Sequence, residues 1–321
     1  MKLRIKRRER IAFDAPVREH HLEWRCAPWD DAGQRLLRCD VACEPAATLA
    51  SHRDCFGNQV HRTALLSTHD GLVLSMQAEV ETLLDDPYAV EPVALERERA
   101  WIADSLHQAP RLWDLVLHRD AAAPLLEALL VGEAPADVGV PADMAEGLPL
   151  LRPNVALFVQ LQDATTWITA GCTVADTPAR AGETAADAIA PVAEPSAARV
   201  LQSATGTAAE LALLLMALAR GWGLPARLVA GYVYTGAAAA PVSAESGVCG
   251  LPGGLHHWAE VLVPGAGWRG FDPARGQVAD AAYARLAVGR DCADLRPLRQ
   301  SWKGEGRLGA CTTELRIERA V

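Results

Sequence analysis

Residues 206–220 form a run that is apolar on nearly every side when it is wound as an α-helix, and this run limits the possible folds more than any other segment. Other elements have to enclose a helix of this kind, so it predicts the buried central helix of a domain. The segment Gly221-Trp-Gly-Leu-Pro225 follows, in which glycine supplies a C-terminal cap and proline prevents the helix from continuing. The sequence therefore predicts a layered domain built around this helix.

Three apolar segments after this helix predict strands, at residues 226–234, 256–263 and 268–271. A glycine- and alanine-rich loop separates the first two, and a Pro-Gly turn separates the last two. His256 begins the second predicted strand, and Asp272 directly follows the third. One buried helix is thus followed by antiparallel strands that carry a histidine and then an aspartate.

The N-terminal part has a different pattern. Residues 2–82 show short segments in which apolar and polar residues alternate between Gly, Asn and Pro turns, which predicts an antiparallel β-sandwich. Helical spacing then recurs at residues 96–106, 110–118 and 121–130. Residues 131–153 and 175–200, rich in Ala, Pro and Gly, predict loops with short helices between them.

These patterns predict an α+β chain of three parts. The first is the N-terminal antiparallel β-sandwich at residues 1–85, the second a helical and loop-rich segment at residues 86–200, and the third a core domain at residues 201–321.

Charge and hydropathy exclude two classes of partner. The chain has 31 Lys and Arg against 40 Asp and Glu, and its net charge of −9 would repel a nucleic acid backbone. Its longest apolar stretch, residues 211–219, is far shorter than a bilayer span, so we expect no membrane contact. The basic N-terminus leads into acidic residues and not into an apolar leader, which predicts a cytoplasmic protein.

Cofactor and metal sites are not expected. The eight cysteines are widely spread and lack C-x-x-C spacing, so most are predicted to be buried apolar side chains in a reducing cytosol. The chain has no glycine-rich phosphate loop of the G-x-x-x-x-G-K type. The adjacent pairs His20-His21 and His256-His257 would point to opposite faces of a strand and chelate poorly.

The helix–histidine–aspartate order is the layout of a thiol-nucleophile enzyme. A cysteine at the start of such a helix is activated because the helix dipole and the free N–H groups favour the thiolate. The histidine takes up the proton, and the aspartate fixes the imidazole tautomer and supports its positive charge. His256 and Asp272 are the candidates for these two roles.

Four ordered blocks stand out in the sequence: Asp54-Cys-Phe-Gly-Asn58, Gly223-Leu-Pro-Ala-Arg-Leu-Val-Ala-Gly-Tyr232, His256-His-Trp-Ala-Glu-Val261 with Gly267-Trp-Arg-Gly-Phe-Asp-Pro273, and Val288-Gly-Arg-Asp291 with Ala293-Asp294. In these blocks the chain resembles the bacterial transglutaminase-like family, whose members carry an N-terminal β-sandwich. The resemblance implies a papain-like core at residues 201–321 with cysteine-dependent acyl transfer as the family chemistry, His256 as the base and Asp272 as its partner.

Three further residues are candidates for the pocket. Trp258 and Trp268 are aromatics of the core or of the pocket wall. Cys249, seven positions before His256, is the thiol nearest to the predicted site in the sequence.

The family's nucleophile is missing from this sequence. Relatives read Gly-x-Cys-Gln-Asp-Phe-Ala-His at the start of the central helix, whereas this chain reads Gly206-Thr-Ala-Ala-Glu-Leu-Ala-Leu213. The cysteine position therefore falls on Ala208, and a methyl group cannot attack a carbonyl. Several neighbours also depart from the family pattern, which favours natural loss over a cysteine replaced by design; both remain open.

The sequence thus predicts a catalytically inactive transglutaminase-like protein that binds a peptide or a partner protein through the retained cleft or the sandwich. By association with such relatives, an ATP-grasp ligase or an active family member is a candidate partner. One alternative is an active thiol-dependent peptidase, amidase or transamidase, with Ala208 engineered from cysteine or with Cys249 as nucleophile. Another is a scaffold with no ligand.

Overall fold

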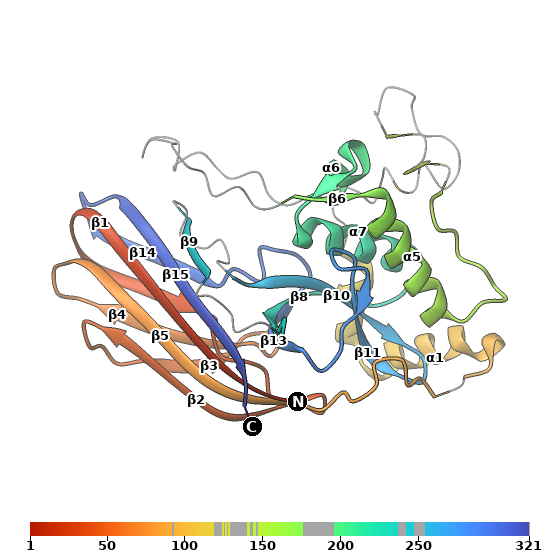
Figure 1. The fold of residues 1–321 in the computed structure, drawn as a ribbon, viewed down its shortest axis with the longest axis horizontal. Helices are drawn as coiled ribbons and strands as arrows, with labels where there is room; N and C mark the ends of the chain where they lie inside the picture. Colours follow the sequence, from red (N-terminus) through yellow and green to blue (C-terminus); the bar gives the residue numbers. More distant parts are fainter. Residues whose placement is uncertain are drawn as a thin grey trace.

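A computed structural model of the chain describes residues 1–91, 93–118, 140–141, 144–145, 147–175, 196–236, 242–246 and 254–320, with Pro124, Leu126 and Ala128. Figure 1 shows long strands at one end of the molecule and the helices gathered at the other. The predicted α+β class is confirmed. The helix predicted at residues 121–130 and the loops at 175–200 fall largely outside the described residues, the loops at 131–153 fall about half outside them, and Cys249 is not among them.

The N-terminal region forms an antiparallel sheet, as predicted. Alternation of polar and apolar residues explains it, since Leu3, Ile5 and Ile11 of the first strand are buried while Lys2 and Arg4 are exposed. The five N-terminal strands are β1 (Lys2–Trp24), β2 (Gln34–Glu44), β3 (Ala50–Arg53), β4 (Gln59–Leu65) and β5 (His69–Thr82).

Strand β1 changes partners along its length. Its first half pairs with β5, whereas residues 20–24 pair with β4. The ladder with β5 shifts register between Ala12 and Val17, and Glu19 has a positive φ of 45°. A strand that bends at such an irregularity can contribute to two layers, which is how sandwiches turn a corner.

The C-terminal strands return to this N-terminal sheet. They are β9 (Val242–Ser246), β14 (Leu298–Gly304) and β15 (Leu308–Arg319). Both β14 and β15 pair with β1, and β9 pairs with β15, so the sheet order is β2-β5-β1-β15-β9. The division at residue 201 therefore needs correction, because the end of the predicted core domain completes the sandwich (Figure 1). The physical reason is the unpaired edge that β1 would otherwise expose.

The core contains a second antiparallel sheet, ordered β12-β11-β10-β8-β13. Helix α7 (Ala208–Gly221) packs on β8 and β10, and ten of its residues are buried, which confirms the predicted central helix. The strands are β8 (Ala226–Val233), β10 (His256–Val263), β11 (Gly267–Asp272), β12 (Gln277–Val278) and β13 (Tyr283–Gly289).

The remaining elements cover the core. Helix α5 (Leu157–Gly171) packs on α7 and on β11 and β12, so the core layer begins before residue 201. Helices predicted at residues 96–106 and 110–118 are present as α1 and as a short 3₁₀ turn with α2. The elements are α1 (Leu95–Gln108), η1 (Pro110–Leu112), α2 (Trp113–Leu117), α5 (Leu157–Gly171), β6 (Thr173–Val174), α6 (Ala197–Ser203) and β7 (Thr205–Gly206).

Candidate functional site

His256 and Asp272 meet at one end of the core sheet. His256 begins β10 and Asp272 ends β11, and the antiparallel pairing of these strands brings the two side chains together. Nε2 of His256 lies 2.6 Å from Oδ2 of Asp272. The Asp272 side chain is fully buried, whereas 18% of the His256 side chain is exposed. Because the carboxylate engages Nε2, Nδ1 is the nitrogen left to act on a reacting group.

Tyr283 joins this pair and was not predicted. Its hydroxyl, at the start of β13, donates to the same Oδ2 of Asp272 at 2.7 Å. Gln277 in turn donates to the Tyr283 hydroxyl, also at 2.7 Å. Burial, and next the charge of Asp272, raise the pKa of Tyr283 well above its usual value, which keeps the hydroxyl protonated as a donor.

The other oxygen of Asp272 is also engaged, because Oδ1 accepts from the backbone N–H of Ala274 at 3.1 Å. The carboxylate is therefore bound by a ring, a hydroxyl and a backbone amide. Such a fixed carboxylate can hold His256 in one tautomer and one orientation. The lone tyrosine among alanines at residues 281–284 is the sequence signal that could have pointed to Tyr283.

Trp258 forms the wall behind His256. Its indole is 99% buried, stacks against the His256 ring with centroids 6.4 Å apart, and meets Tyr283 edge-on at 5.2 Å. Gly231 makes room for it, since a Cβ there would lie 2.4 Å from the indole. Trp258 thus takes part in both the core and the site.

Trp268 lies away from this group, at the opposite end of β11 from Asp272. The guanidinium of Arg227 sits over its ring, 4.1 Å from the centroid. Arg227 also forms a buried ion pair with Glu260, with Nε and Oε2 at 2.8 Å. Trp268 therefore packs against the buried guanidinium of Arg227 and lies apart from the His256–Asp272 pair.

Ala208 is the first residue of α7 and is half-buried. The helix start is fixed by its neighbours: the Thr207 hydroxyl caps the N–H of Glu210, and the Glu210 carboxylate accepts from the backbone N–H of Thr207 at 2.9 Å. Arg199 and the N–H of Ser196 bind the same carboxylate. Ala208 itself supplies only its methyl group.

Glu210 is a further residue that was not predicted, although Thr-x-x-Glu at residues 207–210, directly before an apolar run, is the sequence signature of a capping box. It is 99% buried, and burial alone would raise its pKa. The hydrogen bonds from Thr207, Arg199 and Ser196 outweigh burial and lower the pKa of Glu210 below its usual value. An ionised carboxylate is therefore built into the first turn of α7, where the helix dipole also favours it.

His257 follows His256 on β10 and, by the alternation of strand side chains, lies on the opposite face of the sheet. Burial, and next the charge of His256, lower the pKa of His257 to about 4. Cys249, the candidate substitute nucleophile, lies outside the described residues.

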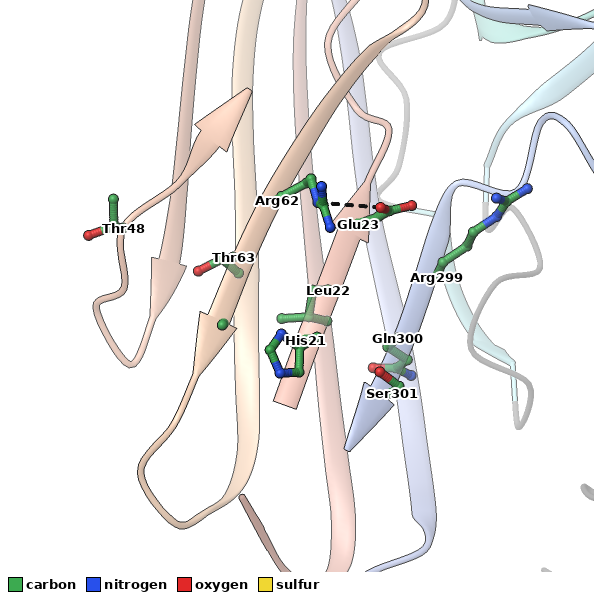
Figure 2. Close-up of a pocket in the computed structure, with 10 residues that line it drawn as sticks. His21, Leu22, Glu23, Thr48, Arg62, Thr63, Arg299, Gln300 and Ser301 are labelled. Atoms are coloured by element: carbon green, nitrogen blue, oxygen red, sulfur yellow. Dashed lines mark ion pairs between the residues drawn. The ribbon is translucent and has the colours of Figure 1, made fainter. Parts of the chain in front are cut away.

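Figure 2 shows a pocket in the sandwich, away from these residues. It has a volume of about 510 Å³ and is lined by residues 21–23 of β1, Thr48, residues 62–64 of β4 and residues 299–301 of β14. Glu23 and Arg62 form an ion pair at 3.4 Å on its surface (Figure 2). None of the predicted catalytic residues lines this pocket.

No helix among the residues that the structure describes is long and apolar enough to cross a bilayer. No group of three or more His, Cys, Asp or Glu side chains among them is placed to hold a metal ion.

Comparison with known proteins finds relatives of both parts. Residues 3–81 match the bacterial transglutaminase-like N-terminal region, and residues 165–273 match the transglutaminase-like superfamily. Uncharacterized proteins of Mycobacterium tuberculosis and Mycobacterium bovis are each 35% identical over 104 residues, which is 31% of this chain. The chain matches only 32% of the length of these relatives.

A solved structure shares the whole fold. It is a Cytophaga hutchinsonii protein described provisionally as a cysteine protease, 16% identical, with a TM-score of 0.62 over 100% of this chain and 92% of that one. At this identity the likeness concerns the fold alone. The core match spans Ala208, His256 and Asp272. The chain thus combines an N-terminal region of the bacterial transglutaminase-like type, at residues 3–81, with a core of the transglutaminase-like superfamily, at residues 165–273.

Proposed function

We propose that this chain is a transglutaminase-like protein without acyl-transfer activity, which uses the surface around His256 or the sandwich to bind a peptide or a partner protein. The observation that carries the proposal is the contrast between a complete His256–Asp272–Tyr283 arrangement and the methyl group of Ala208 at the start of α7. Covalent acyl transfer needs a nucleophile at that helix start, and a methyl group has no lone pair to supply.

Nearby hydroxyls do not replace the missing thiol. The Thr207 hydroxyl donates to Oε2 of Glu210 at 3.0 Å and accepts from the Glu210 N–H, so the helix cap holds its proton and its lone pair. The Ser203 hydroxyl is bonded to the carbonyl of Arg199 at 2.8 Å. Both hydroxyls are engaged in local hydrogen bonds, which supports the proposal that neither of them has replaced the missing thiol as nucleophile.

The proposed ligand is an extended peptide segment, because peptides can pair with the edges of exposed strands. The proposed partners follow from family association: an ATP-grasp peptide ligase, or an active member of the same family. Neither proposal depends on a cofactor or a metal ion.

Activity measurements test the inactive state. Wild-type chain is incubated with a glutamine-containing peptide and a fluorescent amine, and both transamidation and hydrolysis are followed. We expect no turnover from the wild type, and none from Ala208→Cys, because the neighbouring Gln and His of the family are also replaced. Ala208→Cys combined with His256→Ala is the matched control. Turnover by the wild type would overturn the proposal.

The alternative is an active thiol enzyme, and the intact His256–Asp272 geometry favours it. Iodoacetamide labelling at neutral pH, followed by mapping of the modified cysteine, separates the two. Rapid, selective labelling of Cys249 that is lost in His256→Ala would support an active thiol. Slow labelling, led by the exposed Cys55, would support the inactive form.

The cytoplasmic location predicted from the sequence is also part of the proposal. Free thiols at Cys26, Cys39 and Cys43 suit a reducing compartment. Cys311, however, is disulfide-bonded, which is typical of oxidising compartments. Fractionation of cells that express the chain decides the point, and recovery from the periplasm would refute the cytoplasmic location.

A further inference from the structure

Two blocks that carry the family resemblance, residues 54–58 and 288–291, have no role in the proposed chemistry, yet they contact each other. Strand β13 is the last strand of the core sheet, so one of its edges has no strand partner among the described residues. Two buried side-chain amides of the N-terminal region cover this edge instead. They belong to Gln34, 1% exposed, and Asn58, fully buried.

Gln34 binds the backbone of Arg285 as a neighbouring strand would. Its Oε1 accepts from the Arg285 N–H at 2.7 Å, and its Nε2 donates to the Arg285 carbonyl at 3.0 Å. The same Nε2 donates to the carbonyl of Trp29 at 2.9 Å. The N–H of Trp29 also reaches the Arg285 carbonyl, at 3.0 Å. The backbone of Arg285 is therefore held by residues of the N-terminal region, on the edge of β13 that faces away from β8.

Asn58 does the same for Val288. Its Oδ1 accepts from the Val288 N–H at 2.7 Å, and its Nδ2 donates to the Val288 carbonyl at 2.8 Å. The remaining capacity of the amide is used by Trp29 Nε1 at 2.9 Å and by Asp54 at 3.1 Å. All four hydrogen bonds that an asparagine side chain can form are therefore made.

The two amides lie on either side of an irregularity in β13. The ladder with β8 shifts register between Arg285 and Ala287, so β13 loses regular pairing at this point. On the site side of Arg285, the Thr82 hydroxyl donates to the carbonyl of Ala281 at 2.6 Å. The N-terminal region thus holds β13 and the residues before it at several points around Tyr283.

We infer that Gln34 and Asn58 are positioning residues for the His256–Asp272 pair. They hold the outer edge of β13, β13 holds Tyr283, and the Tyr283 hydroxyl holds the Asp272 carboxylate that orients His256. The N-terminal region therefore helps to set the geometry of the site, and a change in how it packs on β13 alters the orientation of the His256 imidazole. This inference is independent of whether the chain is inactive, since it concerns the geometry of the pair and not turnover.

The experiment follows the imidazole proton of His256 in the full chain. Because a carboxylate only accepts hydrogen bonds, the bonded Nε2 carries a proton whose NMR signal is shifted downfield and protected from exchange with water. The protein is labelled with ¹⁵N-histidine, and the signal is assigned by its absence in His256→Gln. Gln34→Ala and Asn58→Ala should each raise its exchange rate about fivefold to tenfold, the factor expected for the loss of a hydrogen bond.

Gln160→Ala is the matched control. Gln160 is a glutamine that is 2% exposed and makes three hydrogen bonds to backbone, accepting from Arg152 N–H and donating to the carbonyls of Arg152 and Val155. Its loss should lower thermal stability about as much as Gln34→Ala does, yet leave the His256 signal unchanged. An equal effect of Gln160→Ala on the signal would overturn the inference, because general loosening would then explain it.

The route through Tyr283 is tested by a double variant. In Tyr283→Phe the hydroxyl that carries the coupling is gone, so adding Gln34→Ala should not accelerate exchange further. An additional acceleration would refute the route. Should the alanine variants fail to fold, Trp29→Phe removes the indole hydrogen bond to Asn58 and keeps an aromatic ring beside Arg227 and Arg285, and it should raise the exchange rate about twofold to fivefold. An unchanged rate in that folded variant would count against the inference.

Discussion

The two halves of the candidate site differ in how firmly the rest of the fold depends on them. On the sheet side, Asp272 is fully buried and is bound by His256, Tyr283 and the N–H of Ala274. On the helix side, Ala208 is half-buried, and residues on either side of it build the helix start. Asp272, the proposed partner of the proposed base His256, is therefore enclosed by the core, whereas Ala208, the proposed nucleophile position, is not.

This difference explains which part of an acyl-transfer site can be lost without cost to the fold. A buried carboxylate with three hydrogen-bond partners cannot be removed without leaving polar groups unpaired. A cysteine at a capped helix start can become alanine with little change in packing, because Thr207 and Glu210 supply the cap. Retention of His256 and Asp272 is thus no proof of activity, since stability alone can preserve them.

The largest effect is expected from Asp272→Ala. The variant leaves the Tyr283 hydroxyl without its acceptor, releases His256, and removes a partner of the Ala274 N–H. We expect a loss of about 3 kcal/mol in the free energy of unfolding, measured by urea denaturation. A loss below about 1 kcal/mol would contradict the difference between the two sides, because the sheet side would then be as dispensable as the helix side.

A smaller effect is expected from Glu210→Gln, which removes the charge that Arg199 and the Thr207 cap stabilise. The expected loss is about 1–2 kcal/mol at neutral pH. The folded pKa of Glu210 lies below its unfolded value, so its contribution is present above about pH 4.5 and disappears as the pH falls further. The variant should therefore lose less stability on acidification below pH 4.5 than the wild type does.

Glu79→Gln is the control for this pH effect, because Glu79 pairs with Arg4 on the exposed face of the sandwich. An exposed ion pair contributes little to the free energy of unfolding, so the stability of this variant should depend on pH as that of the wild type does. A Glu210→Gln profile identical to that of Glu79→Gln would show that the helix cap does not need an ionised carboxylate.

Several elements could be predicted from the sequence because their patterns are local. The apolar run before Gly221 predicts helix α7, and alternation in residues 2–82 predicts the N-terminal sheet. The His256–Asp272 pairing follows once β10 and β11 are recognised as neighbours. Assignment of Ala208 to the nucleophile position came from the family resemblance and not from any local pattern.

Other features could not be predicted because they depend on contacts between distant segments. Strands β14 and β15 return to pair with β1 across nearly the whole chain, and their alternation does not name a partner. Gln34 and Asn58 look like ordinary loop and turn residues, and only the open edge of β13 gives them a role. Tyr283 likewise gains its function from a fold that places it beside Asp272.

Tyr283→Phe tests one hydrogen bond on the sheet side by itself. It removes the donor to Asp272 and the acceptor for Gln277 but keeps the ring packed against Trp258. The expected loss is about 1 kcal/mol in urea denaturation, smaller than for Asp272→Ala because His256 still binds the carboxylate. Tyr88→Phe, at a residue that is 55% exposed, should be neutral. Equal losses in the two variants would show that the buried hydroxyl contributes nothing.

The smallest effect is expected from Ala208→Cys, and it decides how the activity assay is interpreted. A half-buried first residue of a capped helix gains only a thiol, so the free energy of unfolding should change by less than about 0.5 kcal/mol. Leu211→Ala, one turn further into the buried face, should instead cost about 3 kcal/mol. If Ala208→Cys is as stable as the wild type and still inert, the changes at its neighbours have removed the chemistry. If it unfolds, the helix start depends on that methyl group, and the helix side is not the replaceable half of the site.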